Sequence, residues 1–256
     1  AAKTWKGSKW WRMGGGGTVW DSMTYDEEFD LLYFGVGNGS PWPQAIRSPG
    51  GGDNLFLSSI VAVDPDSGAM SWFYQTTPGE SLDFTATQNM ILADLPIGGK
   101  LRKVLMQAPK NGFFYIIDRS TGKLISADNY VKATWATHID PLSGRPVGQK
   151  VYGENLEIMS PSPAGGHNWQ PMAYNPVTKL VYIPVRESSG VFALSQDWIK
   201  HGEIPIRENW WNIGVDWEKY TELNENSDPN HSSNDFGFLG AWDPLKSRYD
   251  WTYQHS

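Results

Sequence analysis

The sequence contains no cysteine. Disulfides, thiolate zinc sites and a haem attached through a Cys-x-x-Cys-His motif are therefore excluded from this chain, and cysteine usage does not indicate its redox compartment. The five histidines also lack the paired spacing that is typical of zinc ligands. No run of about 18 apolar residues occurs, so no transmembrane segment is expected in this chain.

Basic residues are in the minority. There are 21 Lys and Arg against 28 Asp and Glu, a net charge of −7, and no basic stretch stands out. This balance argues against binding to nucleic acid or to an anionic membrane surface. The first residues hold no apolar signal-peptide core, and the chain starts at Ala1 instead of Met, as expected of a mature form or an internal piece of a longer protein.

Residues of short strands and tight turns are abundant, with 14 Trp, 11 Tyr, 10 Phe, 27 Gly and 17 Pro. Strands are predicted where β-branched and aromatic runs lie between turn-forming clusters: Leu31–Val36, Ser59–Val63, Met70–Gln75, Val104–Ala108, Phe113–Asp118, Leu180–Val185 and Phe238–Trp242. Only Gln196–His201 and Trp217–Leu223 suggest helices, and both are brief. The chain is therefore predicted to be all-β, with many short antiparallel strands.

The sequence repeats itself at long range. One pattern, Trp20, Met23, Tyr25, Asp26, Leu31 and Tyr33, recurs 149 positions later as Trp169, Met172, Tyr174, Asn175, Leu180 and Tyr182. A second recurs 179 positions later: Ala62-x-Asp64-Pro65 followed by Trp72-x-Tyr74-Gln75. The repeats divide the chain into units of four strands at about 18–76, 83–130 and 167–254, the last with an insert at about 188–236. Four antiparallel strands per unit of this length are typical of a β-propeller blade.

Three blades cannot close a ring, because propellers have about four to eight. The chain is therefore predicted to be a segment of a larger propeller, or part of an assembly that completes one. Trp72 and Trp251 recur at equivalent positions and are predicted to be buried where neighbouring blades pack.

The repeat also predicts which residues lie near the propeller axis. The start of each first strand and the connection between its second and third strands lie on one face of a blade. Those positions are occupied by Thr18, Trp20, Asn38, Asp83, Lys110 and Asn168. Together they would form a pocket with an aromatic surface, a carboxylate, amide groups and a cation, which is a typical arrangement for a binding site.

Each of these residues has a structural alternative. Trp20 is equally explained as a core residue, Asp83 as a turn cap, Asn38 as part of the turn string Gly-Asn-Gly-Ser-Pro, and Lys110 as a solvated charge. Asp64–Gly68 resembles half of a calcium loop but lacks the bidentate Glu, so it is predicted to be a turn.

Several long strings resemble one family. These strings are GGGGTVWDSM, YFGVGNGSPW, RSPGGGDNLFLSSIVAVDPDSG, TPGESLDFTATQ, VLMQAPKNGFFYIIDRSTGKLIS and GGHNWQPMAYNP. They resemble the quinoprotein alcohol dehydrogenases that use pyrroloquinoline quinone (PQQ), and the alcohol dehydrogenases and quinohaemoproteins more than methanol dehydrogenase. The resemblance implies part of a periplasmic, eight-bladed propeller that holds PQQ and Ca²⁺ on its axis.

The resemblance also implies a role for each axial residue. Trp20 would stack on PQQ, Thr18 and Asn168 would contact the cofactor, and Lys110 would lie near the quinone oxygens. Asn38 and Asp83 would be metal-site residues, with Asp83 as the catalytic base. Such oxygen ligands suit Ca²⁺, a hard cation.

The implied activity is oxidation of primary alcohols to aldehydes by hydride transfer to Ca²⁺-bound PQQ, with cytochrome c or a quinone as electron acceptor. A haem c is expected only in a C-terminal domain outside this chain. The alternative is a non-catalytic propeller that serves as a binding scaffold. The 256-residue chain alone is expected to lack half of its site and to be inactive. The Trp-rich insert, including Glu208-Asn-Trp-Trp-Asn212, is expected to cover the mouth of the pocket.

Overall fold

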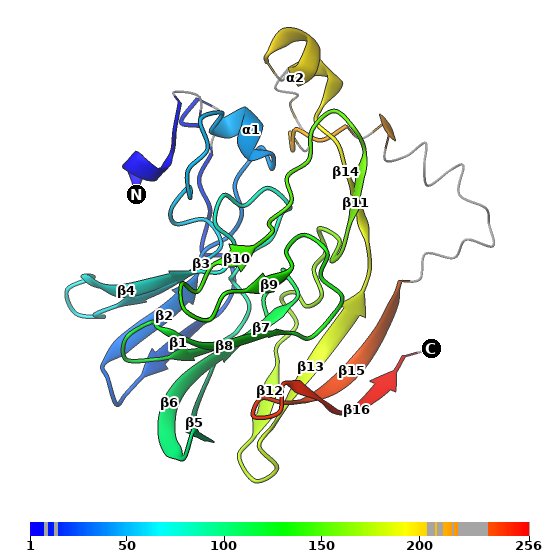
Figure 1. Ribbon diagram of the computed structural model, residues 1–256. Helices are drawn as coiled ribbons and strands as arrows, with labels where there is room; N and C mark the ends of the chain where they lie inside the picture. The colour runs from blue at the N-terminus through cyan, green and yellow to red at the C-terminus, as the bar shows by residue number, and fades with distance from the viewer. Residues whose placement is uncertain are drawn as a thin grey trace.

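The structure is a computed structural model that describes residues 1–7, 10–12, 15–203, 208, 212–216, 218–219 and 235–255. Three antiparallel sheets of four strands each dominate it (Figure 1). The prediction of an all-β chain with four-stranded antiparallel units is confirmed. Among the described residues, no helix is long and apolar enough to cross a membrane.

The strands of the three sheets lie in the following order. The first sheet contains β1 (Met23–Asp26), β2 (Leu31–Gly35), β3 (Ser59–Val63) and β4 (Met70–Gln75). The second contains β5 (Ile91–Ile97), β6 (Lys100–Gln107), β7 (Phe113–Asp118) and β8 (Leu124–Asn129). The third contains β12 (Ala173–Asn175), β13 (Leu180–Glu187), β15 (Phe236–Asp243) and β16 (Arg248–Gln254).

Smaller elements connect these sheets. Two further hydrogen-bonded pairs are present: β9 (His138–Ile139) with β10 (Pro146–Val147), and β11 (Glu157–Met159) with β14 (Gly190–Phe192), which follows β13 in the chain. The helices that lie wholly within the described residues are η1 (Ala2–Thr4), α1 (Gln44–Arg47) and α2 (Gln196–His201), and α2 has the predicted bounds. The other predicted helix, Trp217–Leu223, lies largely outside the described residues.

The 149-residue repeat is a structural repeat of one hairpin. The Asp26 side chain accepts hydrogen bonds from the backbone amides two and three residues later, those of Glu28 and Phe29. The Asn175 side chain accepts the equivalent bonds from residues 177 and 178. Asp30 and Lys179 then take the same left-handed backbone conformation, with φ of 50° and 61°. The repeated Asx residue therefore sets the same turn in the first and third sheets.

The turn between the third and fourth strands also repeats. Each sheet has one register shift at the equivalent place, between Ala62 and Val63, Ile116 and Ile117, and Ala241 and Trp242. The Asp64 carboxylate accepts the amides of residues 66 and 67, which confirms the predicted turn. Ser247 occupies the left-handed position that Gly68 fills in the first sheet, so the degenerate copy keeps the same turn.

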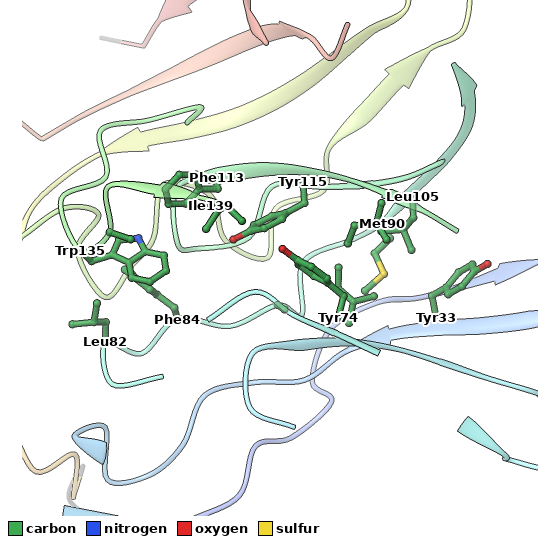
Figure 2. Close-up of a cluster of buried hydrophobic side chains, with 14 of the residues drawn as sticks. Tyr33, Tyr74, Leu82, Phe84, Met90, Leu105, Phe113, Tyr115, Trp135 and Ile139 are labelled. Carbon is green, nitrogen blue, oxygen red and sulfur yellow. The ribbon is translucent and has the colours of Figure 1, made fainter. Parts of the chain in front are cut away.

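The second sheet is packed on both faces, because its alternate residues point to opposite neighbours. Leu105 and Ile117 belong to a core with residues of the first sheet, whereas Met106 and Ile116 belong to a core with residues of the third. Figure 2 shows the first core, in which the Tyr74 and Tyr115 rings lie 5.6 Å apart. The sheets therefore pack face to face in chain order, as propeller blades do.

The two repeated tryptophans have different environments. Trp72 is 8% exposed, its indole N–H donates to the Arg119 carbonyl, and its ring lies against Gly122 of the second sheet. The prediction that Trp251 is buried in the same way is wrong, because Trp251 is 42% exposed. The physical reason is that no described sheet lies beyond β16 to accept it.

A further copy of the turn was not predicted. Asp140 accepts the amides of Leu142 and Ser143 in the β9–β10 hairpin. Tyr74 donates to the carbonyl of Gly144 at 2.7 Å, so this turn is docked by a tyrosine of the first sheet. Its flanking strands have two residues each, too few for a period-two pattern to reveal them.

Candidate active site

The central feature of the candidate site is an ion pair between Asp83 and Lys110. Lys110 Nζ lies 3.0 Å from Asp83 Oδ2 and also donates to the Asp83 carbonyl at 3.1 Å. Lys110 comes from the β6–β7 connection and Asp83 from the segment before β5. Because Lys110 is only 6% exposed, the alternative of a solvated loop charge is wrong.

Asp83 is held in an unusual state. Its φ is 63°, a left-handed conformation that non-glycine residues rarely adopt. Burial raises the pKa of its carboxyl above the ordinary value, and the charge and hydrogen bond of Lys110 oppose that rise. Oδ1 accepts no hydrogen bond from the described residues, so one carboxylate oxygen remains available for a ligand. Among the described residues its side chain accepts no backbone amide either, which is inconsistent with a turn cap.

Asn38 lies on a loop that runs alongside the Asp83 segment. Beyond β2, Val36 accepts the Ala86 amide at 3.2 Å, and Gly39 donates to the Glu80 carboxylate at 3.4 Å. Asn38 Nδ2 donates locally to the Gly39 carbonyl at 3.1 Å, and Oδ1 accepts nothing from the described residues. The fold thus brings Asn38 and Asp83 onto adjoining segments and leaves an oxygen of each without a donor.

Trp20 and Thr18 lie beside the same loop. The Thr18 carbonyl accepts the Gly37 amide at 2.9 Å, and a methyl group at Gly37 would lie 3.2 Å from Trp20 Nε1. Trp20 is 44% exposed, so the alternative of a core residue is wrong. An open indole therefore lies next to the residue that precedes Asn38.

Asn168 approaches from the third repeat unit. Its Nδ2 donates to the Ala164 carbonyl at 3.1 Å, while its Oδ1 is buried with no hydrogen-bond partner among the described residues. The same loop contacts the Lys110 segment, because the Gly166 amide donates to the Lys110 carbonyl at 3.1 Å. Asp21 Oδ2, next to Trp20, is a second buried oxygen without a partner in the described chain.

The described residues of the site could supply only some of the ligands of a bound metal ion. Within the described ranges, no three His, Cys, Asp or Glu side chains are grouped so as to hold a metal ion. Ca²⁺ takes six to eight oxygen ligands. The free oxygens of Asn38 and Asp83 match the chemistry of such ligands but would need others to complete the shell.

Sequence reasoning missed two fully buried residues, Glu80 and Arg47. Burial raises the pKa of the Glu80 carboxyl to about 7; Arg47 opposes this rise and Asp83 reinforces it. The available signal was the string Gly79-Glu-Ser-Leu-Asp83, in which a second carboxylate lies three residues before the predicted base. Turn-forming neighbours made that Glu indistinguishable from a solvated loop residue.

These features define a class: a β-propeller segment in which an Asp–Lys ion pair lies on loops that adjoin segments with amide side chains and an exposed tryptophan. The profile of the glucose/ethanol/alcohol dehydrogenase β-propeller domain, the PQQ type, matches residues 1–129. The chain therefore belongs to the PQQ-dependent alcohol dehydrogenase family, as part of its β-propeller domain.

Individual relatives agree with this assignment. The chain is 52% identical to quinohemoprotein alcohol dehydrogenase ADH IIB of Pseudomonas putida, covering 98% of this chain and 35% of that protein. It is 44% identical to an alcohol dehydrogenase (quinone) dehydrogenase subunit of Gluconobacter oxydans, covering 100% of this chain and 34% of the subunit. The crystal structure of the Comamonas testosteroni quinohemoprotein alcohol dehydrogenase superposes with a TM-score of 0.86 at 45% identity, over 99% of this chain and 37% of that one. The chain thus spans about a third of the length of these relatives.

Proposed function

We propose that this chain carries part of the active site of a PQQ- and Ca²⁺-dependent enzyme that oxidises primary alcohols to aldehydes. The observation that carries the proposal is the buried Asp83–Lys110 pair, which presents a free carboxylate oxygen on the segment next to Asn38. A largely buried carboxylate with a perturbed pKa beside a specific charge partner is more typical of an active site than of a binding scaffold. Membership of the family and the names of the relatives support the same activity.

The residues present fit the cofactor pair. The Oδ1 atoms of Asn38 and Asp83, which accept no hydrogen bond from the described residues, would bind Ca²⁺. The exposed indole of Trp20 offers a flat surface for the PQQ rings. The buried, unpaired Oδ1 of Asn168 would accept a hydrogen bond from a bound group. Thr18 is exposed beside Trp20 and would make a further polar contact.

Asp83 would act as the general base. When bound, PQQ supplies a two-electron acceptor for hydride and Ca²⁺ supplies a Lewis acid. The Asp83 carboxylate would take the proton of the alcohol O–H group on an Oδ1 lone pair that is not directed at the metal; the O–H electron pair becomes the second bond of the carbonyl as hydride leaves the alcohol carbon. Each turnover thus removes one proton and one hydride and leaves the aldehyde.

Lys110 would keep this base in its charged form and in position. Its two hydrogen bonds to Asp83 fix the carboxylate, and its charge opposes the rise in pKa that burial causes. An ammonium group in a low-dielectric site would also stabilise negative charge that develops on a nearby quinone oxygen.

The wider setting follows from the family. We propose a periplasmic enzyme that takes small alcohols and passes electrons to cytochrome c or to a quinone. The relatives' names include both a quinohemoprotein and an alcohol dehydrogenase (quinone). This chain contains no cysteine, so a covalently attached haem c would belong to another part of the protein.

The test is Asp83→Asn in the full-length enzyme. Loss of a general base should lower kcat by about 10²–10⁴-fold, while PQQ remains bound and visible in the absorption spectrum. Asp66→Asn is the matched control, because Asp66 is exposed and its carboxylate makes no hydrogen bond. Wild-type kcat in Asp83→Asn would show that the assigned mechanism is wrong.

A further inference from the structure

One buried carboxylate lies between the two segments that carry the predicted Ca²⁺ ligands. Glu80 is fully buried. Its Oε1 accepts the amide of Leu82 at 2.5 Å and the amide of Phe84 at 2.9 Å. These are the residues on either side of Asp83, so this one oxygen holds the backbone on both sides of the base.

The other oxygen of Glu80 faces the second segment. Oε2 lies 3.4 Å from the amide nitrogen of Gly39, which directly follows Asn38. A single side chain is thus bonded to the backbone neighbours of both predicted ligands. Because breaking these bonds would leave buried amides and carboxyl oxygens without partners, the link resists separation of the two segments.

Arg47 joins the same two segments a second time. It is fully buried, and its guanidinium donates to the carbonyls of Pro41, Trp42 and Glu80. A methyl group at Gly39 would lie 2.6 Å from Arg47 Cζ, so only glycine admits this close approach. The guanidinium also provides the positive charge that partly compensates the buried Glu80.

The link matters because Asp83 is not in a relaxed conformation. Its left-handed φ of 63° is unfavourable for a residue with a side chain and persists only where neighbouring bonds enforce it. The hydrogen bonds from the Leu82 and Phe84 amides to Glu80 lie on either side of Asp83 in the sequence. They therefore hold Asp83 in its left-handed conformation from within the same loop.

We propose that Glu80 is a positioning residue, whose carboxylate fixes Asn38 and Asp83 relative to one another before Ca²⁺ binds. The inference rests on the proposed function of these two ligands and deepens it. Glu80 need not touch the metal, the cofactor or the substrate in order to act.

The test is Glu80→Gln in the full-length enzyme freed of Ca²⁺ by chelation. The amide oxygen can still accept from Leu82 and Phe84, but its NH₂ group would face the Gly39 amide, donor against donor. Loss of an outer partner of a metal ligand costs about 10–100-fold in metal affinity, which is the expected weakening of the Ca²⁺ Kd measured by calorimetry. Saturating Ca²⁺ should restore kcat, as it would not for a catalytic group. Glu27→Gln, on an exposed turn, is the control and should bind Ca²⁺ like the wild type.

Asn38→Ala separates the two proposals. If Asn38→Ala leaves the Ca²⁺ affinity unchanged, the proposed metal site is wrong. If Asn38→Ala loses affinity while Glu80→Gln binds Ca²⁺ like the wild type, only the positioning role of Glu80 is overturned. A second measurement needs no variant: in Ca²⁺-free wild-type protein, the amides of Gly39, Leu82 and Phe84 should stay protected from hydrogen exchange. Protection that disappears on chelation would show that the metal, not Glu80, orders these segments.

Discussion

Asp83 is largely buried and has a left-handed backbone conformation, and the proposed role of a general base requires its carboxylate to be charged. Burial favours the neutral acid, and a general base must be ionised. Lys110, from the β6–β7 connection, opposes this effect, because its ammonium group favours the charged carboxylate. In the proposed function, the pair therefore favours an ionised base where burial alone would favour the neutral acid.

Lys110→Met should move the acid limb of the kcat/KM–pH profile to higher pH. Lys110 lowers the pKa of Asp83, so its removal leaves the raising effect of burial unopposed. A base with a higher pKa loses its ionised form at a higher pH as the solution is acidified, which fixes the sign. Met keeps much of the apolar stem. The control is Lys123→Met, an exposed lysine of the β7–β8 turn, and an acid limb that does not move in Lys110→Met would contradict this role.

Individual site residues were predictable where the repeat placed them in the pocket or the family resemblance implied a role for them. Asp83 and Lys110 were assigned to one pocket, and the structure joins them at 3.0 Å. Glu80 and Arg47 escaped notice because their importance comes from tertiary burial, which a single sequence does not encode locally. A buried ion pair between distant loops has no spacing rule comparable to the i, i+4 rule of helices.

At the scale of elements, strand prediction succeeded where apolar β-branched runs ended at turn residues. Ser59–Val63 and Phe113–Asp118 have the predicted bounds. β5 and β8 were not predicted as strands: β5 contains a proline, and β8 is only partly buried. The repeated turns were the more reliable signal, because an Asx residue sets them by local hydrogen bonds.

These turns predict a dependence of stability on acid. Hydrogen bonds from Ser67 and Ser143 lower the pKa of Asp64 and Asp140 below the ordinary value. A carboxyl with a depressed pKa in the folded state stabilises that state fully above the ordinary pKa, and this contribution is lost as pH falls through the folded pKa. Asp64→Asn with Asp140→Asn should therefore flatten the loss of stability below about pH 4.

The measurement is urea unfolding of the protein at neutral pH and at acid pH. Asn keeps an oxygen acceptor for the turn amides, so the double variant should still fold. Asp66→Asn removes a charge from the same loop without removing a hydrogen bond and serves as the control. If the double variant has the same acid dependence as the wild type, the turn carboxylates do not contribute to it.

For the whole molecule, the important fact is that both ends of the row of sheets are open. Aromatic side chains are exposed in the first and the third sheet: Tyr25 of the edge strand β1 is 51% exposed, and Tyr253 of the edge strand β16 is 67% exposed. Exposed aromatic side chains on an unpaired sheet face are what a neighbouring blade would cover. Since the chain spans about a third of its relatives, further blades are the expected cover.

Trp251 provides a direct test of that expectation. Trp72 docks on the next sheet through Gly122 and the Arg119 carbonyl, and Trp251 holds the equivalent position beside the equivalent bulge. If a further blade follows, Trp251 should dock on it in the same way. In the full-length protein, Trp72→Ala and Trp251→Ala should then each lower the free energy of unfolding by about 3–5 kcal/mol, the usual cost of truncating a buried tryptophan.

Trp11→Ala is the matched control, because this indole is 55% exposed near the N-terminus and no sheet register places it at a docking position. The measurement is chemical denaturation of the three variants beside the wild type. A Trp251→Ala variant as stable as Trp11→Ala would mean that the face of β16 stays open. Something other than a blade of the same kind would then follow the third sheet. The repeat would predict the sheets of this chain but not the structure that packs beside them.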